Sequence, residues 1–335
     1  MITKQQSAQN KATVYSAWVS FILSLVVFGF KFIAYQMTHS TAIFSDAMES
    51  VVNVVASFAA LFVMKAVAEP ADEEHPYGHG KLEYFSAAFE GGLIAFAAIA
   101  IGVESIRALI HPKELTQPDI GLWVMTAAAV VNLGLGLHLK YVGKKYKSDA
   151  LLASGVHVIS DVWTTVAVLV GLGIVWWTGI SWIDPLFALF VALHLIYSGY
   201  QIVRQAIGAL IDEVEPSSLL DLGAAFQKCK KPWVIDIHQL KTIRSGHFHH
   251  IDAHLVVPEF WDVGRTHEEM TRFEADVVSV YPFDGEIAFH LDPCERKYCH
   301  MCEFENCAVR KVPCTSPRKF EVEKMIRAPE GLLKK

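Results

Sequence analysis

The chain has 335 residues, of which 53% are hydrophobic and only 19% are charged. With a mean hydropathy of +0.32, it is too apolar for an ordinary soluble protein. Its net charge of -6 argues against a nucleic-acid partner. The apolar excess lies in residues 1–208, so we expect a membrane domain there, a soluble domain at 209–293 and a cysteine-rich tail at 294–335.

Six apolar stretches are each long enough to cross a bilayer as a helix, which needs about 20 residues. They lie near residues 15–37, 42–65, 84–108, 120–142, 150–177 and 183–206. The first is too long to be a removable signal peptide and lacks a small-residue cleavage site. Lysines gather on one side of the expected bundle, as at Lys144, Lys145 and Lys147. The sequence therefore predicts a multi-pass membrane protein with both termini in the cytoplasm.

The soluble part alternates helical and strand patterns. Helices are expected at 216–229 and 263–281, and strands at 234–244, 249–257 and 286–291. This helix–strand–strand–helix–strand order is typical of a small, ferredoxin-like α+β domain with helices on one face of the sheet. Because a domain of this size has a modest core, dimerisation or bound metal would help to stabilise it.

Two of the expected membrane helices carry polar pairs at a spacing of four residues. Glu49 and Asn53 form one pair, with Asp46 on the same helix face, and His157 and Asp161 form the other. Ionisable groups in hydrocarbon are costly and are therefore candidates for function. Together these side chains suit a four-coordinate zinc site that also tolerates ferrous iron, cobalt or cadmium. The alternative is that each residue only forms hydrogen bonds between helices.

Two further clusters combine histidine with carboxylate. One is Asp72, His75 and His79, in the loop after the second helix, where a solvated loop without metal is the alternative. The other lies on the expected strands of the soluble domain, where the alternative is ordinary surface or core residues. Its members are His238, His254, His290 and Asp292. A local strip of His247, His249 and His250 is either additional ligands or exposed turn residues.

The tail holds five of the six cysteines of the chain. Their spacing is Cys294-x4-Cys299-x2-Cys302-x4-Cys307, followed by Cys314. Disulfides are not expected on the cytoplasmic side of a membrane. We favour a zinc knuckle held by Cys294, Cys299, Cys302 and Cys307. An iron–sulfur cluster and free thiols are the alternatives.

These features resemble the cation diffusion facilitator family, and most closely its bacterial zinc and ferrous-iron efflux transporters. The resemblance covers about residues 10–294 and rests on the two membrane pairs, the segment PADEEHPYGHGKLE, the six spans and the soluble domain ending in HLDPC. It implies that Glu49, Asn53, His157 and Asp161 form the transport site. This set departs from the family on the second helix, where zinc-transporting relatives usually have two aspartates, or histidine and aspartate.

The resemblance also implies roles for the other clusters. The loop residues would bind a metal at the cytoplasmic face, with His267 of the soluble domain as a further ligand. The soluble-domain set would form a binuclear site at the interface of a homodimer.

We therefore expect a homodimeric exporter of divalent metal, coupled to inward proton movement, with zinc as the first candidate and ferrous iron as the second. Manganese, cobalt and cadmium are alternative substrates. Asn53 is the residue that makes manganese a candidate, because sites with asparagine also occur in manganese-type members of the family. Because protons and metal compete for imidazole and carboxylate, His157 is the expected coupling residue. The rival is a non-transporting membrane metal sensor or partner-recruiting protein with an inactive membrane site. No nucleophile–base pair indicates an enzyme.

Overall fold

The computed structural model describes residues 4–67, 69–111, 118–146, 149–246, 248–305 and 307–327. They divide into two compact units. The first comprises residues within 1–69 and 82–207, and the second comprises residues within 70–81 and 208–335. The loop that carries Asp72, His75 and His79 thus belongs to the same unit as the soluble domain and the tail.

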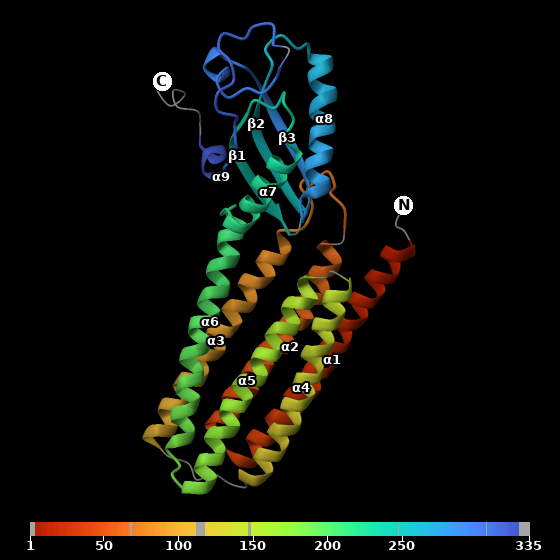
Figure 1. Cartoon of the computed structure of the whole chain (residues 1–335). Helices are drawn as coiled ribbons and strands as arrows, with labels where there is room; N and C mark the ends of the chain where they lie inside the picture. The colour runs from red at the N-terminus through yellow and green to blue at the C-terminus, as the bar shows by residue number, and fades with distance from the viewer. Residues whose placement is uncertain are drawn as a thin grey trace. The chain divides into compact units, whose positions relative to one another are not determined.

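Six helices in the described part of the chain are long and apolar enough to span a membrane, which confirms the predicted number (Figure 1). Their bounds are α1 Lys4–Thr38, α2 Thr41–Val67, α3 Leu82–Ile110, α4 Pro118–Tyr146, α5 Asp149–Thr178 and α6 Ile183–Leu210. Most are a few residues longer than the apolar stretches, and α1 begins well before residue 15. Helices satisfy their own backbone hydrogen bonds, which is why this fold is stable in hydrocarbon.

Small residues allow two helix pairs to approach closely. A Cβ on Gly91 of α3 would lie 3.0 Å from the carbonyl oxygen of Gly199 on α6. A Cβ on Gly155 of α5 would lie 2.7 Å from the backbone nitrogen of Lys140 on α4. Such glycine contacts are typical of membrane helix packing, where close van der Waals contact replaces hydrophobic burial as the driving force.

Asp184, at the start of α6, fixes the position of α2. Its carboxylate accepts hydrogen bonds from the hydroxyl of Ser40 at 2.5 Å and from the backbone N–H groups of Thr41 and Ala42 at 2.6 and 3.3 Å. A buried carboxylate at a helix N-terminus satisfies free N–H donors and complements the helix dipole. This contact anchors the helix that carries Glu49 and Asn53.

The second unit contains the predicted α+β domain, and its element order confirms the predicted fold class. The elements are α7 Pro216–Cys229, β1 Asp236–Ser245, β2 Phe248–Val257, α8 Val263–Val280 and β3 Asp284–Pro293. The three strands lie in the order β1-β2-β3 (Figure 1). β1 pairs antiparallel with β2, and β2 pairs parallel with β3 after the crossover through α8.

The two faces of this sheet are covered differently. On one face, Phe226 of α7 and Phe273 of α8 pack with strand residues such as Ile251 in the main core. On the other face, the tail contributes Tyr298 and Cys302 to a smaller cluster. The tail continues to the short helix α9, Val322–Ile326, which packs on β1, with Met325 reaching the main core. The tail is therefore folded onto the domain.

Candidate metal sites

The four predicted membrane ligands converge on one small cavity. Glu49 and Asn53 reach it from α2, and His157 and Asp161 reach it from α5. The cavity has a volume of about 30 Å³, enough for an ion or a water molecule. Ser160 and Thr164 add hydroxyl groups to its wall.

Asn53 connects the two halves of this quartet. Its Nδ2 donates to Asp161 Oδ2 at 2.5 Å, so its Oδ1 faces His157 Nε2 at 3.0 Å. Since a carbonyl oxygen can only accept, His157 carries a proton on Nε2 in this arrangement. The same nitrogen lies 3.9 Å from Asp161 Oδ1. Glu49 is held by the hydroxyl of Thr164, which donates to its Oε2 at 2.9 Å.

Two further polar side chains lie at or near the cavity. His194 of α6 lines it. Glu90 of α3 places Oε1 3.7 Å from His157 Nε2. Neither residue lies four positions from another histidine, carboxylate or asparagine on its own helix. Only the packing of α3 and α6 against the pairs brings them to the site.

Asp46 has a different partner from the one its helix face suggested. Its Oδ2 forms an ion pair with Lys31 Nζ at 2.7 Å, and its Oδ1 accepts from Thr165 at 2.7 Å. The side chains of Lys31 and Asp46 are 1% and 0% exposed. The amine of Lys31 is therefore buried between helices and does not extend toward the membrane interface. This pair leaves Asp46 neutralised beside the quartet rather than facing the cavity as a ligand.

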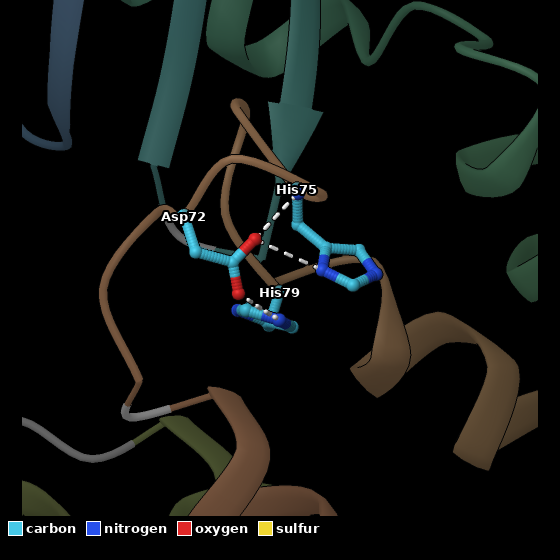
Figure 2. Close-up of side chains that lie close together, drawn as sticks. All are labelled: Asp72, His75 and His79. Atoms are coloured by element: carbon cyan, nitrogen blue, oxygen red, sulfur yellow. Dashed lines mark hydrogen bonds and ion pairs between the residues drawn. The ribbon is translucent and has the colours of Figure 1, made fainter.

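The loop cluster is assembled in the structure (Figure 2). Asp72 Oδ1 accepts from the backbone N–H of His75 at 2.6 Å and lies 3.2 Å from its Nδ1. Asp72 Oδ2 lies 3.6 Å from Nε2 of His79. The backbone bond from His75 holds the pKa of the Asp72 carboxyl below its usual value. Ligand atoms from all three residues lie within 4.8 Å of one another, a spacing that suits a metal ion.

The loop is fixed at the end of the sheet. The hydroxyl of Ser245 donates to the carbonyl oxygen of Tyr77 at 3.0 Å, and the ring of Tyr77 packs edge-on against His250. A Cβ on Gly80 would lie 2.2 Å from the carbonyl oxygen of Ser245, so only glycine fits there. His267 does not join the loop cluster, because it lies exposed near the start of α8.

The soluble-domain cluster follows directly from strand register. His238 on β1 is opposite His254 on β2, which is opposite His290 on β3. Asp292, two residues after His290, shares its sheet face. Asp292 Oδ2 lies 3.3 Å from His238 Nε2 and 2.9 Å from His254 Nδ1, while its Oδ1 lies 3.6 Å from His290 Nε2. We call these four residues the histidine row.

Two comparisons identify the family. A family model described as the cation efflux transmembrane domain matches residues 17–211, and one described as the cytoplasmic domain of cation efflux proteins matches residues 225–294. The chain belongs to the cation diffusion facilitator family. This cation-efflux transporter has relatives that match most of its length.

An uncharacterised transporter of Synechocystis sp. is 34% identical over 286 residues, which cover 84% of this chain and 91% of the relative. The cation-efflux pump FieF of Cronobacter sakazakii is 30% identical over 289 residues, with coverage of 85% and 93%. FieF of Yersinia pestis is 30% identical over 288 residues, with coverage of 85% and 93%. The residues after Cys294 lie outside both matched domains.

The two described histidines at the β1–β2 turn of this transporter, His249 and His250, have different hydrogen-bond partners. The buried His249 places Nδ1 2.7 Å from the hydroxyl of Tyr281, whose pKa burial raises to about 12. His250 Nδ1 lies 2.8 Å from Glu286 Oε1. His247 lies outside the described residues. In the described part of the chain, neither His249 nor His250 joins a three-residue ligand group.

The four predicted tail ligands of the transporter also come together. Cys294, Cys299, Cys302 and Cys307 line one small pocket against the sheet. Cys314 and Cys229 are not among its lining residues. All six cysteines lie in the described part of the chain, and none of them forms a disulfide.

Zinc held by the loop cluster is expected to depend on pH. Imidazole nitrogen binds metal only when neutral, so zinc should be released as the pH falls from about 7.5 to about 5.5. The Asp72 carboxyl stays ionised through this range, because its pKa is lowered in the folded loop. Its own contribution is present above its unfolded pKa and is lost only as the pH falls through the lower, folded pKa. Release of zinc in this window is therefore not caused by protonation of Asp72.

The measurement is equilibrium dialysis with zinc, comparing the whole protein with its Asp72→Ala variant at each pH. The difference should be about one zinc per protomer at neutral pH and should vanish in acid. Glu73→Ala is the matched control, because Glu73 is an exposed carboxylate beside the cluster. An equal loss of zinc in both variants would contradict the site.

Proposed function

We propose that this transporter exports divalent transition metal from the cytoplasm in exchange for protons, with zinc as its main substrate and ferrous iron as the second. It acts as a homodimer in a bacterial inner membrane, with both termini in the cytoplasm. The observation that carries the proposal is the meeting of Glu49, Asn53, His157 and Asp161 around one cavity. Family membership supports cation efflux as the direction of transport.

The donor set supports a borderline metal. It combines one imidazole nitrogen, two carboxylates and one amide oxygen. Zinc accepts nitrogen and oxygen ligands in four-coordinate sites, whereas hard ions such as manganese favour all-oxygen sites. The neutral amide of Asn53 leaves the site with less negative charge than three carboxylates would give. This supports moderate affinity, which suits a site that must also release its cargo.

The hydrogen bonds of Asn53 support proton exchange. His157 Nε2 donates to Asn53 Oδ1, and Asn53 Nδ2 donates to Asp161. A metal that bound here would need the lone pairs of His157 and Asp161, so the Nε2 proton would have to leave. Protons arriving from the opposite side of the membrane would in turn weaken metal binding. Alternating access around this fixed site would convert the competition into antiport.

The test is metal flux in proteoliposomes that contain a pH dye. Zinc, ferrous iron, manganese, cobalt and cadmium are compared at equal concentration. The expected result is zinc uptake with opposite proton movement, slower iron uptake and little manganese uptake. Ser198→Ala is the matched control, because Ser198 lines the same cavity without belonging to the quartet. Zinc flux with no proton movement would overturn the antiport mechanism.

Asn53→Asp should make zinc transport more sensitive to pH. A carboxylate at this position would face Asp161 at hydrogen-bond distance and would retain a proton at low pH because of charge repulsion. The KM for zinc should fall near pH 8, where a third carboxylate attracts the ion, and should rise more steeply than in the parent toward about pH 6. Parallel pH profiles for the two proteins would contradict this role of Asn53.

The second candidate function is a non-transporting metal sensor. The observation that favours it is that Asn53 ties His157 to Asp161, so that all three side chains are already hydrogen-bonded to one another. In a sensor, the histidine row would bind zinc while the membrane quartet bound none. The flux experiment separates the two functions, because the sensor gives no flux of any ion while the soluble domain still binds zinc.

The soluble domain supports a regulatory part in the proposed transporter. His254 and His290 line an open hollow on the sheet face that carries the histidine row. A partner protomer that covered this face would complete the coordination of metals held there. Bound metal would thereby bias the balance between the protomer arrangements of the dimer.

A further inference from the structure

The cysteine-rich tail brings four thiols to one pocket, and three of them lie beyond the residues that the family models match. Cys294 directly follows β3, and its backbone N–H donates to the carbonyl oxygen of Val257 at 2.9 Å. Cys299 and Cys302 follow in a tight turn, in which the N–H of Met301 bonds to the oxygen of Tyr298 at 3.0 Å. Cys307 comes from the next loop, and all four thiols line the same pocket.

Backbone N–H groups face two of these thiols. The backbone N–H groups of Glu259 and Phe304 donate to the sulfur atoms of Cys294 and Cys302. N–H donors around sulfur are the outer contacts that orient metal-bound thiolates and tune their charge. Cys294 and Cys302 pack with Ile235 and Val256 on the sheet side. Cys294, Cys299 and Cys302 are buried.

Arg310 supplies a compensating positive charge and shapes the loop around the pocket. Its guanidinium donates to the carbonyl oxygens of Cys299, Cys302 and Phe304 at 3.4, 3.1 and 2.6 Å. Four thiolates around Zn²⁺ carry a net charge of about -2, which must be offset at a half-buried site. The single guanidinium of Arg310 offsets about half of this charge, and its three bonds to carbonyl oxygens hold the ligand loop in shape.

We propose that Cys294, Cys299, Cys302 and Cys307 bind one structural zinc ion, which fastens the tail to the outer face of the sheet beside the histidine row. Binding releases the four thiol protons to solvent and involves no change of oxidation state. Among the described residues, the ligand groups within 4.8 Å are the loop cluster and part of the histidine row. The thiols therefore stand wider than the sulfur spacing of about 3.8 Å in a zinc tetrahedron, and the metal would draw them together.

This position explains what the site would do. Arg318, further along the tail, forms an ion pair at 2.7 Å with Asp236, whose carboxylate lies 3.8 Å from His238. The tail then delivers Phe320 and Met325 to the main core. Zinc would close the loop between the end of β3 and these contacts. Loss of zinc should thus expose the Arg310–Lys319 segment.

The first test uses the whole protein in detergent, without any substitution. Iodoacetamide labelling is mapped by mass spectrometry before and after treatment with a strong zinc chelator. Cys307 and Cys314 are a matched pair, since both are half-buried and only Cys307 lines the pocket. We expect Cys314 to react in both conditions and Cys307 to react only after chelation, together with new tryptic cleavage between Arg310 and Lys319. Equal labelling of both thiols before chelation would overturn the proposal.

The second test replaces zinc with cobalt(II), whose thiolate charge-transfer absorption reports sulfur ligands and ignores the histidine sites. Cys307→Ser should weaken cobalt binding at this site by more than the ~10–100-fold typical of losing an outer partner. Cys314→Ser and His238→Ala should leave the absorption unchanged. An unchanged spectrum in monodisperse Cys307→Ser protein would overturn the site. If the purified parent protein contained iron and acid-labile sulfide, the four thiols would hold an iron–sulfur cluster, and the zinc proposal would be overturned.

Discussion

Replacing Asp161 by alanine is expected to abolish zinc flux in proteoliposomes. Asp161 is 2% exposed, accepts the 2.5 Å hydrogen bond of Asn53 and belongs to the same cavity as Glu49. Its loss would remove one of two carboxylates from the quartet and would leave the amide of Asn53 without its acceptor. Loss of an outer partner alone costs about 10–100-fold in metal affinity, so loss of a ligand should cost more.

The measurement is the initial rate of zinc uptake, taken together with binding to the detergent-purified protein. Thr164→Val is the variant to compare with Asp161→Ala. Thr164 is not one of the four proposed ligands, but its hydroxyl donates a hydrogen bond to the ligand Glu49. This variant should retain flux at a reduced rate, with a loss nearer ten-fold than a hundred-fold. Full zinc flux in Asp161→Ala protein would exclude the quartet as the transport site.

Replacing Lys31 by methionine is expected to destabilise the membrane unit by about 3–5 kcal/mol, because it leaves the Asp46 carboxylate buried without a counter-charge. Both side chains of the pair are almost completely buried, at 1% and 0% exposure. Asp46 would keep only the hydrogen bond from Thr165. The measurement is the free energy of unfolding of the detergent-purified protein, followed by denaturant titration.

The double variant Lys31→Met/Asp46→Asn should recover much of this loss, since removing both charges also removes the cost of burying them. Lys231→Met is the matched control. Its ion pair with Asp276 has a similar N–O distance of 2.8 Å, but the side chains are 43% and 49% exposed. Breaking an exposed pair should cost about 0–1 kcal/mol. Similar losses in Lys31→Met and Lys231→Met would contradict a structural role for the buried pair.

The position of Asp46 on its helix could be predicted from the sequence, but its partner could not. Helical spacing correctly placed Asp46 on the face of Glu49 and Asn53. It could not show that Lys31 of α1 packs against that position, because the register between two helices depends on the contacts of both. The ion pair removes Asp46 from the set of available ligands and gives Lys31 a buried role that its own helix did not indicate.

The histidine row was easier to predict than the tail pocket for a geometric reason. Strand periodicity places His290 and Asp292 on one face, and short connections make β1 and β2 neighbours. The exact opposition of His238, His254 and His290 then follows from pairing. In the tail, only a three-residue 3-10 helix, Arg296–Tyr298, lies between the first two cysteines. The positions of the thiols there depend on Arg310 and the sheet behind them.

The amino-acid sequence alone was enough to predict the six spans, the α+β order of the soluble domain and the polar pairs on α2 and α5. Each of these depends on periodicity or spacing within a single segment, and such patterns record which face of that segment is buried. The tertiary structure decided which side chains from different segments meet. It joined Glu90 and His194 to the quartet, paired Asp46 with Lys31 and left His267 outside the loop cluster. These outcomes depend on distances between elements, which are set by close packing of the whole unit and leave no periodic trace in the chain.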